Sequence, residues 1–183
     1  MNKIETARLL LRPIEKEDAA AIYEFSCNPN VGLSAGWKPH ETLEESLEIM
    51  NQIFIGQEHI FGIILKDSNK LIGSIGLMPD PHRENPQAMM IGYALAEEQW
   101  GKGLMKEAAT AVIEYGFKEH NFSLITCTCY PDNIRSHRVI EKCGFTHEGC
   151  LRQCEVRYDG AVMDMECFSI TPEEWEKMVL IKT

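Results

Sequence analysis

The sequence contains no long apolar run. No stretch approaches the about 18 consecutive apolar residues that a membrane-spanning helix requires. The opening residues 1–13 carry charges throughout and lack the apolar region of a secretory signal peptide. We therefore expect a protein without membrane association and with a cytoplasmic location.

Positive charge is scarce. The 183 residues include 18 Lys and Arg against 28 Asp and Glu, which gives a formal net charge of −10 at pH 7. This balance argues against a protein that holds nucleic acid on a basic surface, so we expect no nucleic-acid partner. It would suit a cationic partner such as an amine or a basic peptide, although the same balance is common among proteins of other functions.

Paired cysteine motifs are missing as well. The chain has seven cysteines, an odd number, and none belongs to a Cys-x-x-Cys pair. Cys127 and Cys129 are separated by one residue and Cys150 and Cys154 by three, and no His pair follows at a zinc-binding spacing. We expect free, buried or half-buried thiols and no metal.

Strand-like and helix-like patterns alternate along the chain, without a repeat or a linker. Strands are expected at residues 7–12, 59–66, 71–78, 88–95, 123–130, 150–158 and 162–170. Helices are expected at residues 15–26, 43–54, 104–119 and within 131–145, with a last helical turn at 172–178. Residues 28–40, rich in Pro, Gly and Asn, are expected to form a loop, and Thr42 with Glu45 a capping box.

This order of elements predicts an α+β fold. We expect a single domain over residues 1–183, with a core at about residues 5–171 and a short C-terminal helix after it. Its sheet should be mixed but mostly antiparallel, with about seven strands and one β-α-β crossover at residues 88–130.

Two glycines, Gly101 and Gly103, precede the helical pattern that begins at Leu104. A helix N-terminus exposes about four unpaired N–H groups and a partial positive charge, and glycine lets a phosphate approach that backbone. The alternative is a helix start that needs only positive φ or close packing. A P-loop is excluded because Gly-Lys-Ser/Thr is missing, and a Rossmann site is disfavoured because a third glycine is missing.

The context of these glycines resembles a known family. In chain order, TARLLLRPIEKEDA, GYALAEEQWGKGLMKEA and DNIRSHRVIEKCGFTHEG resemble the GCN5-related N-acetyltransferase (GNAT) superfamily, specifically its Rim-type branch of ribosomal-protein N-acetyltransferases. The resemblance implies a three-layer α/β/α sandwich in which the fourth and fifth expected strands, 88–95 and 123–130, splay apart. It also implies acetyl-CoA as co-substrate and a primary amine as acceptor.

The resemblance assigns residues to the coenzyme. The pyrophosphate would lie on the backbone N–H groups of the loop formed by Trp100, Gly101, Lys102, Gly103, Leu104, Met105 and Lys106. The pantetheine arm would pair with the backbone of Tyr93, Ala94 and Leu95, where the N–H of Ala94 or Leu95 could also receive the developing oxyanion. Met105 departs from the Gly or Ala of the family pattern, so its side chain must point away from the phosphates.

Catalysis requires a neutral amine. An α-amine has a pKa near ~8 and a lysine near ~10.4, so a base helps. Glu155, in the stretch EGCLRQCE, resembles the base proposed for the enzyme that acetylates the ribosomal stalk protein; the alternative is an exposed strand carboxylate. Strand alternation would place Glu155 on one face with Gln153 and Arg157.

Other candidates follow from the same resemblance. Asn133 and Ser136 form the Asn-x-x-Ser of the Rim-type branch, in which a hydroxyl lies near the coenzyme sulfur; the alternative is a plain helix cap. Trp37 would wall the acceptor site or anchor the core. Tyr130 is a weaker candidate, structural or a proton donor, and His137 is expected to be exposed to solvent.

The sequence leaves the identity of the acceptor amine undecided. The chain could acetylate a protein N-terminus or another peptide amine, or a small amine such as a polyamine, an amino acid or an antibiotic. A different class, a catalytically silent CoA-binding module, is disfavoured because Ser136 and Glu155 are both present. The chain could be a monomer or a homodimer.

Overall fold

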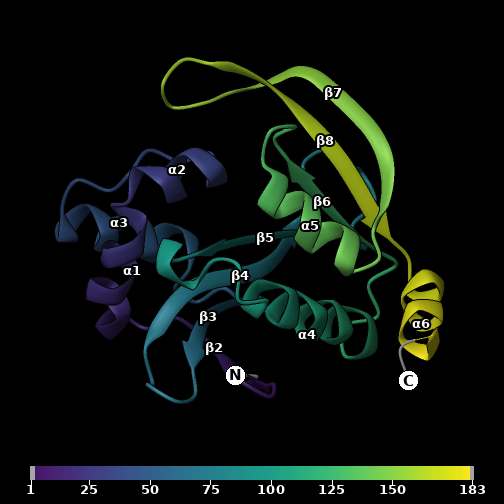
Figure 1. The fold of residues 1–183 in the computed structure, drawn as a ribbon, viewed down its shortest axis with the longest axis horizontal. Coiled ribbons are helices and arrows are strands. Elements are labelled where there is room, and N and C mark those ends of the chain that lie inside the picture. Colours follow the sequence, from purple (N-terminus) through teal and green to yellow (C-terminus); the bar gives the residue numbers. More distant parts are fainter. Residues whose placement is uncertain (1–2, 182–183) are drawn as a thin grey trace. The chain divides into compact units, whose positions relative to one another are not determined.

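The structure, a computed structural model, describes residues 3–181. One mixed sheet has the strand order β1-β2-β3-β4-β5-β6-β8-β7 (Figure 1). The strands are β1 (Ile4–Glu5), β2 (Leu9–Arg12), β3 (Ile60–Leu65), β4 (Leu71–Pro79), β5 (Ala88–Leu95), β6 (Leu124–Cys129), β7 (Thr146–Val156) and β8 (Val162–Ile170). The α-helices are α1 (Ala19–Ser26), α2 (Pro29–Ala35), α3 (Leu43–Ile53), α4 (Leu104–Lys118), α5 (Ile134–Lys142) and α6 (Pro172–Ile181), with 3₁₀ turns η1 (Lys16–Asp18) and η2 (Glu97–Gln99).

The predicted α+β class and the mixed, mostly antiparallel sheet are confirmed. β5 and β6 pair in parallel, whereas β1–β2, β2–β3, β3–β4, β6–β8 and β7–β8 pair antiparallel. The sheet has eight strands rather than about seven, because the two-residue β1 is too short to carry a sequence pattern. No helix among residues 3–181 has the length and apolarity to cross a bilayer.

The loop expected at residues 28–40 is wrong over its first half, which forms α2. Asn28 caps this helix by accepting a hydrogen bond from the Asn30 N–H at 2.9 Å, and Pro29 occupies the first helical position. Gly36, with φ 86°, ends it in the left-handed conformation. The residues that suggested a loop are therefore the start and stop signals of a two-turn helix.

Of the two hydrogen bonds in the capping box expected at the start of α3, one forms as predicted. The Thr42 hydroxyl accepts from the Glu45 N–H at 3.1 Å, as predicted. The Glu45 carboxylate, however, accepts from the N–H of Glu41 at 2.5 Å rather than from that of Thr42. The second bond is thus donated by the residue before the cap rather than by the cap itself.

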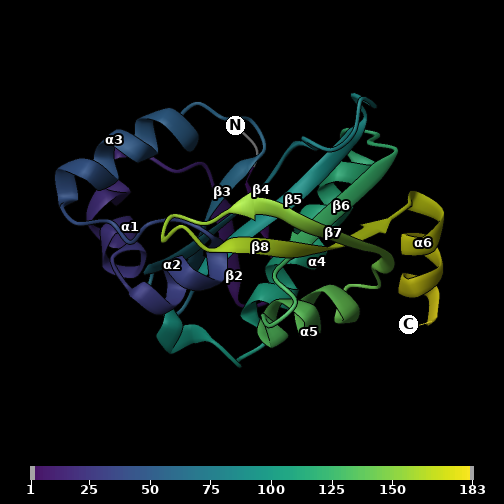
Figure 2. The ribbon, with the colours of Figure 1, turned by 90° about the horizontal axis from the view of Figure 1, so that it is seen from above.

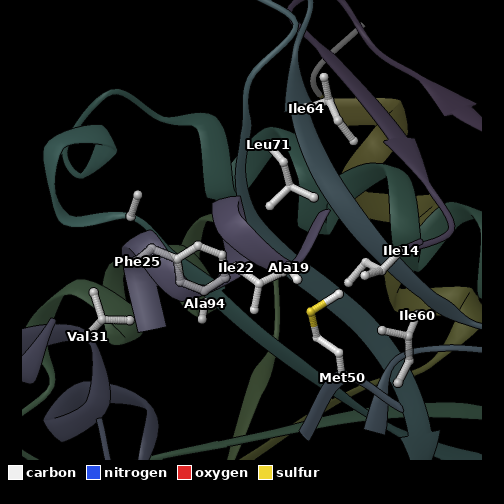
Figure 3. Packing of buried hydrophobic residues seen from close by; sticks show 11 residues of the cluster. Ile14, Ala19, Ile22, Phe25, Val31, Met50, Ile60, Ile64, Leu71 and Ala94 are labelled. Atoms are coloured by element: carbon white, nitrogen blue, oxygen red, sulfur yellow. The ribbon is translucent and has the colours of Figure 1, made fainter. Parts of the chain in front are cut away.

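The chain divides into two compact units. The first comprises the described parts of residues 1–76 and 93–111, and the second those of 77–92 and 112–183. In the first, apolar side chains from α1, α3, β3 and β4 form one cluster (Figure 3). Ile22 and Met50 at its centre are 0% exposed. This cluster supports the strands that lead into the glycine loop.

In the second unit, β6 pairs with β8, and β8 pairs with β7 in a long hairpin (Figure 2). The start of β5 completes this part of the sheet, with Ala88 opposite Leu124 and Met90 opposite Thr126. Gly116 of α4 packs so closely that a Cβ there would lie 2.9 Å from Leu77 Cδ1. A larger residue at this position would have to displace the Leu77 side chain where the helix meets the sheet.

Pairing between β5 and β6 stops before either strand ends. The last registered pair among the described residues is Met90 with Thr126, although β5 continues to Leu95 and β6 to Cys129. On its other side β5 lies beside β4. The two strands come so close that a Cβ on Gly73 would be 2.3 Å from the Ala94 carbonyl oxygen. This early end of the parallel pairing is what the splayed-strand prediction requires.

Candidate active site

The glycine loop owes its glycines to backbone conformation. Gly101 has φ 77° and Gly103 has φ 74°, values that residues with a Cβ rarely adopt. Apart from its two chain neighbours, no residue in the described range 3–181 has an atom within 4 Å of a Cβ built on Gly101, so packing does not require glycine there. Residues 101–103 are exposed and lead directly into the 15-residue helix α4. The loop thus opens the N-terminus of a long helix to solvent.

The side chains beside the glycines are used for packing. Leu104 is 3% and Met105 7% exposed, so both are buried. The Met105 side chain therefore leaves the exposed loop free, as its departure from the family pattern requires. Any ligand at this loop would meet backbone N–H groups rather than these two side chains.

Trp100 ties the loop to the end of β5. Its indole Nε1 donates to the Leu95 carbonyl oxygen at 2.8 Å, and its ring packs against the apolar cluster of the first unit. Lys102 is exposed, with its Nζ 3.0 Å from Gln99 Oε1. Of the three predicted pantetheine residues, Ala94 and Leu95 are buried and Tyr93 is half-buried.

Asn133 and Ser136 open α5 in the second unit. Asn133 Oδ1 accepts from the Ser136 N–H at 3.1 Å, which is the N-cap that the sequence indicates. Ser136 is 8% exposed. Burial raises the pKa of the Cys129 thiol to about 11, and a hydrogen bond from the Ser136 side chain opposes this rise. The hydroxyl is thus already directed at a sulfur atom.

Glu155 contacts Tyr130, a pairing that the sequence does not reveal. Tyr130, at the end of β6, is 4% exposed, and its hydroxyl donates to Glu155 Oε1 at 2.5 Å. Burial, followed by the bond to Glu155, raises the pKa of Tyr130 above its ordinary value. The Arg157 guanidinium lies 5.9 Å from the centroid of the same ring. Glu155 itself is half-buried.

The strand alternation expected around Glu155 is interrupted. The β7–β8 register shifts between Leu151 and Glu155, and Gln153 in this bulge has φ 51°. The Gln153 N–H donates to Asp164 Oδ1 at 2.7 Å, and its side chain is exposed. The prediction that Gln153 shares the face of Glu155 through regular alternation therefore does not hold.

Two aromatic candidates are more buried than a solvent-facing site requires. His137 is half-buried, with its ring edge-on to Phe168 at 5.6 Å between centroids, so the expectation of an exposed His137 is wrong. Trp37 is half-buried and packs against the apolar cluster of the first unit. Its Nε1 is buried without a hydrogen-bond partner in the described part of the chain.

All seven cysteines are free. Cys127, Cys129 and Cys143 are buried, whereas Cys150 and Cys154 on β7 are exposed rather than buried or half-buried as expected. The predicted site residues divide between the two units. Trp37, residues 93–95 and residues 100–106 belong to the first unit, and Asn133, Ser136 and Glu155 to the second.

Comparison with known proteins gives consistent results. Residues 8–146 match the family model described as acetyltransferase (GNAT) domain. The uncharacterized N-acetyltransferase YnaD of Bacillus subtilis (strain 168) is 34% identical over 174 residues, covering 94% of this chain and 98% of that protein. The crystal structure of a GNAT-family acetyltransferase from Bacillus anthracis superposes with a TM-score of 0.83 at 30% identity, covering 94% of this chain and 99% of that one. The ribosomal-protein-S5-alanine acetyltransferase from Vibrio fischeri superposes with a TM-score of 0.76 at 25% identity, covering 96% and 99%.

Proposed function

The chain belongs to the GNAT family of acetyltransferases, and on that premise we propose that it acetylates the α-amine of a protein or peptide N-terminus. Like its family, it is an acetyl-CoA-dependent N-acetyltransferase. The Vibrio fischeri relative is named for acetylation of an alanine of ribosomal protein S5, which supports a peptide α-amine as acceptor. The net charge of −10 is compatible with a cationic acceptor.

The observation that supports acetyl-CoA as the acetyl donor is the exposed glycine loop at the start of α4. Gly101 and Gly103 would let a phosphate approach the backbone of the exposed residues 101–103, and the N-terminus of α4 would add its partial positive charge. The end of β5, residues 93–95, lies beyond the last parallel pair and offers backbone groups for the pantetheine arm. The N–H of Ala94 or Leu95 would then stabilise the oxyanion.

Glu155 is the proposed base. An acceptor α-amine with a pKa near ~8 is mostly protonated at neutral pH, so a carboxylate that takes its proton, directly or through water, generates the nucleophile. The hydrogen bond from Tyr130 holds one oxygen of Glu155 in place and leaves the second for the amine. Because this hydrogen bond fixes the direction of the carboxylate, the second oxygen of Glu155 can accept the amine proton along one path.

Ser136 is the proposed group beside the leaving thiolate. Its hydroxyl, buried at the first turn of α5, would donate to the sulfur as the carbon–sulfur bond breaks. The neighbouring Cys129 sulfur competes for that hydrogen bond, so the serine would exchange one sulfur acceptor for another. The thiolate then takes a proton from solvent.

A thiol-release screen tests the acceptor. Purified protein is incubated with acetyl-CoA and with peptides that begin with Ala or Ser, with the same peptides blocked at the N-terminus, and with polyamines and free amino acids. We expect release with the free peptides alone. Release with a polyamine or an amino acid, and none with any peptide, would overturn the peptide-amine proposal.

Two matched variants test the base. Glu155→Gln should lower turnover by ~10²–10⁴ and leave the Kd for acetyl-CoA unchanged. Glu141→Gln, an exposed carboxylate on α5 of the same unit, should keep wild-type turnover. Equal turnover for the two variants would show that Glu155 is a strand carboxylate without a catalytic role.

A further inference from the structure

Arg8, which lies in the stretch TARLLLRPIEKEDA but was given no role there, reaches the glycine loop. It lies between β1 and β2 in the first unit, and its Nη1 donates to the carbonyl oxygen of Lys102 at 3.0 Å. Its Nε donates to Glu107 Oε2 at 2.7 Å. One guanidinium thus bonds both the loop and the first turn of α4, 94 and 99 residues further along the chain.

Glu107 is held from its other side as well. Its Oε1 accepts from the Thr6 hydroxyl at 2.6 Å and from the Arg8 N–H at 2.8 Å. Although burial opposes ionisation, the hydrogen bonds from Thr6 and Arg8 lower the pKa of Glu107 below its ordinary value. The carboxylate is therefore charged at neutral pH.

A charged Glu107 creates a conflict at this helix end. A carboxylate in the first turn suits the helix dipole, but it repels a phosphate that arrives at the same N-terminus. Arg8 removes the conflict because its positive charge lies against the carboxylate. The pair is neutral, and the partial positive charge of α4 remains for the ligand.

The guanidinium has one nitrogen left. Nη2 lies 3.7 Å from the point that a Cβ on Gly103 would occupy, and among the described residues, leaving out Gly103 and its two chain neighbours, no other atom comes within 4 Å of that point. No partner for Nη2 appears among the described residues, and the Arg8 side chain is 49% exposed. A donor with positive charge is thus fixed beside Gly103 and open to solvent.

We infer that Arg8 is a phosphate-binding residue, whose Nη2 donates to the diphosphate of acetyl-CoA at the glycine loop. The inference rests on the proposed placement of the coenzyme. Guanidinium groups bind phosphate through charge-assisted hydrogen bonds, and two contacts already fix this one, so little side-chain entropy is lost on binding. Lys102 and Lys106 also carry charge at the loop, but neither has its ammonium fixed beside Gly103 by two backbone or carboxylate contacts.

Calorimetric titration of Arg8→Gln tests the inference. We expect the Kd for acetyl-CoA to rise about ten- to a hundredfold, the effect of one hydrogen bond to a charged group. The Kd for S-acetylpantetheine, which lacks the diphosphate, should stay unchanged and shows that the variant is folded. Lys66→Gln, which removes an exposed cation paired with Glu5 in the same unit, is the control and should bind acetyl-CoA like the wild type.

Glu107→Gln separates phosphate binding from support of the loop. It removes the negative charge and leaves Arg8 its bond to Lys102. If Arg8 meets the phosphate, this variant binds acetyl-CoA as tightly as the wild type or tighter. If Arg8 only positions the loop through Glu107, Glu107→Gln weakens binding as much as Arg8→Gln does, and the inference fails.

The source of the phosphate is tested with acetyl-3′-dephospho-CoA. Arg8→Gln should weaken this ligand as much as it weakens acetyl-CoA. A loss confined to acetyl-CoA would assign Arg8 to the 3′-phosphate and overturn the diphosphate assignment. Wild-type protein that binds no acetyl-CoA would refute the proposed coenzyme site, whereas wild-type binding with an unaffected Arg8→Gln would refute only the role of Arg8.

Discussion

The Tyr130 hydroxyl and Glu155 Oε1 are 2.5 Å apart and join the end of β6 to the end of β7. The phenol is buried and the carboxylate half-buried, so the hydrogen bond is shielded from water on one side. Removing the hydroxyl leaves the ring in place. This contact therefore permits a test of how much the orientation of Glu155 matters.

We expect Tyr130→Phe to lower turnover by about tenfold, because one hydrogen bond to a charged group is lost. The Kd for acetyl-CoA should not change. Tyr158→Phe, at an exposed tyrosine after β7, is the control, and equal turnover in the two variants would remove Tyr130 from the mechanism.

Gly103→Asp should abolish stabilisation by acetyl-CoA. Wild-type protein with ligand at about 100 times its Kd gains ~2.7 kcal/mol of unfolding free energy. The aspartate would place a carboxylate where a phosphate binds. Gly160→Asp is the matched control, since Gly160 has φ 84° and open space around it, so it carries the same backbone strain. A ligand-induced rise in Tm in both variants would exclude the glycine loop as the phosphate site.

Ser136→Ala should slow turnover by roughly ten- to a hundredfold, the contribution of one hydrogen bond to a thiolate. The N-cap survives, because Asn133 bonds the Ser136 backbone N–H rather than its hydroxyl. Tm is measured beside the rate. An unchanged rate, or a rate loss that follows a fall in Tm, would show that the serine belongs only to the helix start.

Asp18→Asn should lower the unfolding free energy by about 2–3 kcal/mol, since it breaks a mostly buried ion pair. Asp18 accepts from Arg12 Nη1 and Nη2, each at 2.7 Å, and its side chain is 10% exposed. The prediction is checked by urea unfolding at neutral pH. A loss below about 0.5 kcal/mol would place this pair among ordinary surface ion pairs.

The same carboxylate predicts a pH dependence. Burial opposes its charged form, but the hydrogen bonds from Arg12 and from the Glu15 N–H outweigh burial and lower the pKa of Asp18. Its contribution is therefore complete above the unfolded pKa of about 3.9 and is lost as pH falls through the folded pKa below that value. Wild-type stability should fall over this acid range more steeply than that of Asp18→Asn.

The regular elements were predictable because their signals are local. β5 has the bounds that its apolar run indicates, and α4 begins directly after the glycines. α2 was missed because Asn28, Pro29 and Gly36 have the same composition in a loop and in a short capped helix. Position within the pattern, with Pro first and Gly last, was the signal that could have found it.

The contacts of the candidate site were less predictable. Tyr130 and Glu155 are separated by 25 residues, and a bulge at Gln153 breaks the alternation that would relate them. Arg8 and Glu107 are 99 residues apart, so no local pattern connects them. Periodicity indicates which face of an element is buried, but long-range pairs depend on register shifts and on loop conformation.

The bulge between Leu151 and Glu155 also makes this hairpin adjustable. Side chains alternate along a strand, so if the bulge keeps its form, removing one residue from it would shift the pairing beyond it by one residue and turn Glu155 to the opposite face. Insertion or deletion of single residues here could then switch the carboxylate on or off, or offer a different side chain to Tyr130, without rebuilding the sheet. Length variation at residues 151–155 is thus a simple evolutionary change by which one fold could lose, regain or replace the carboxylate that faces Tyr130.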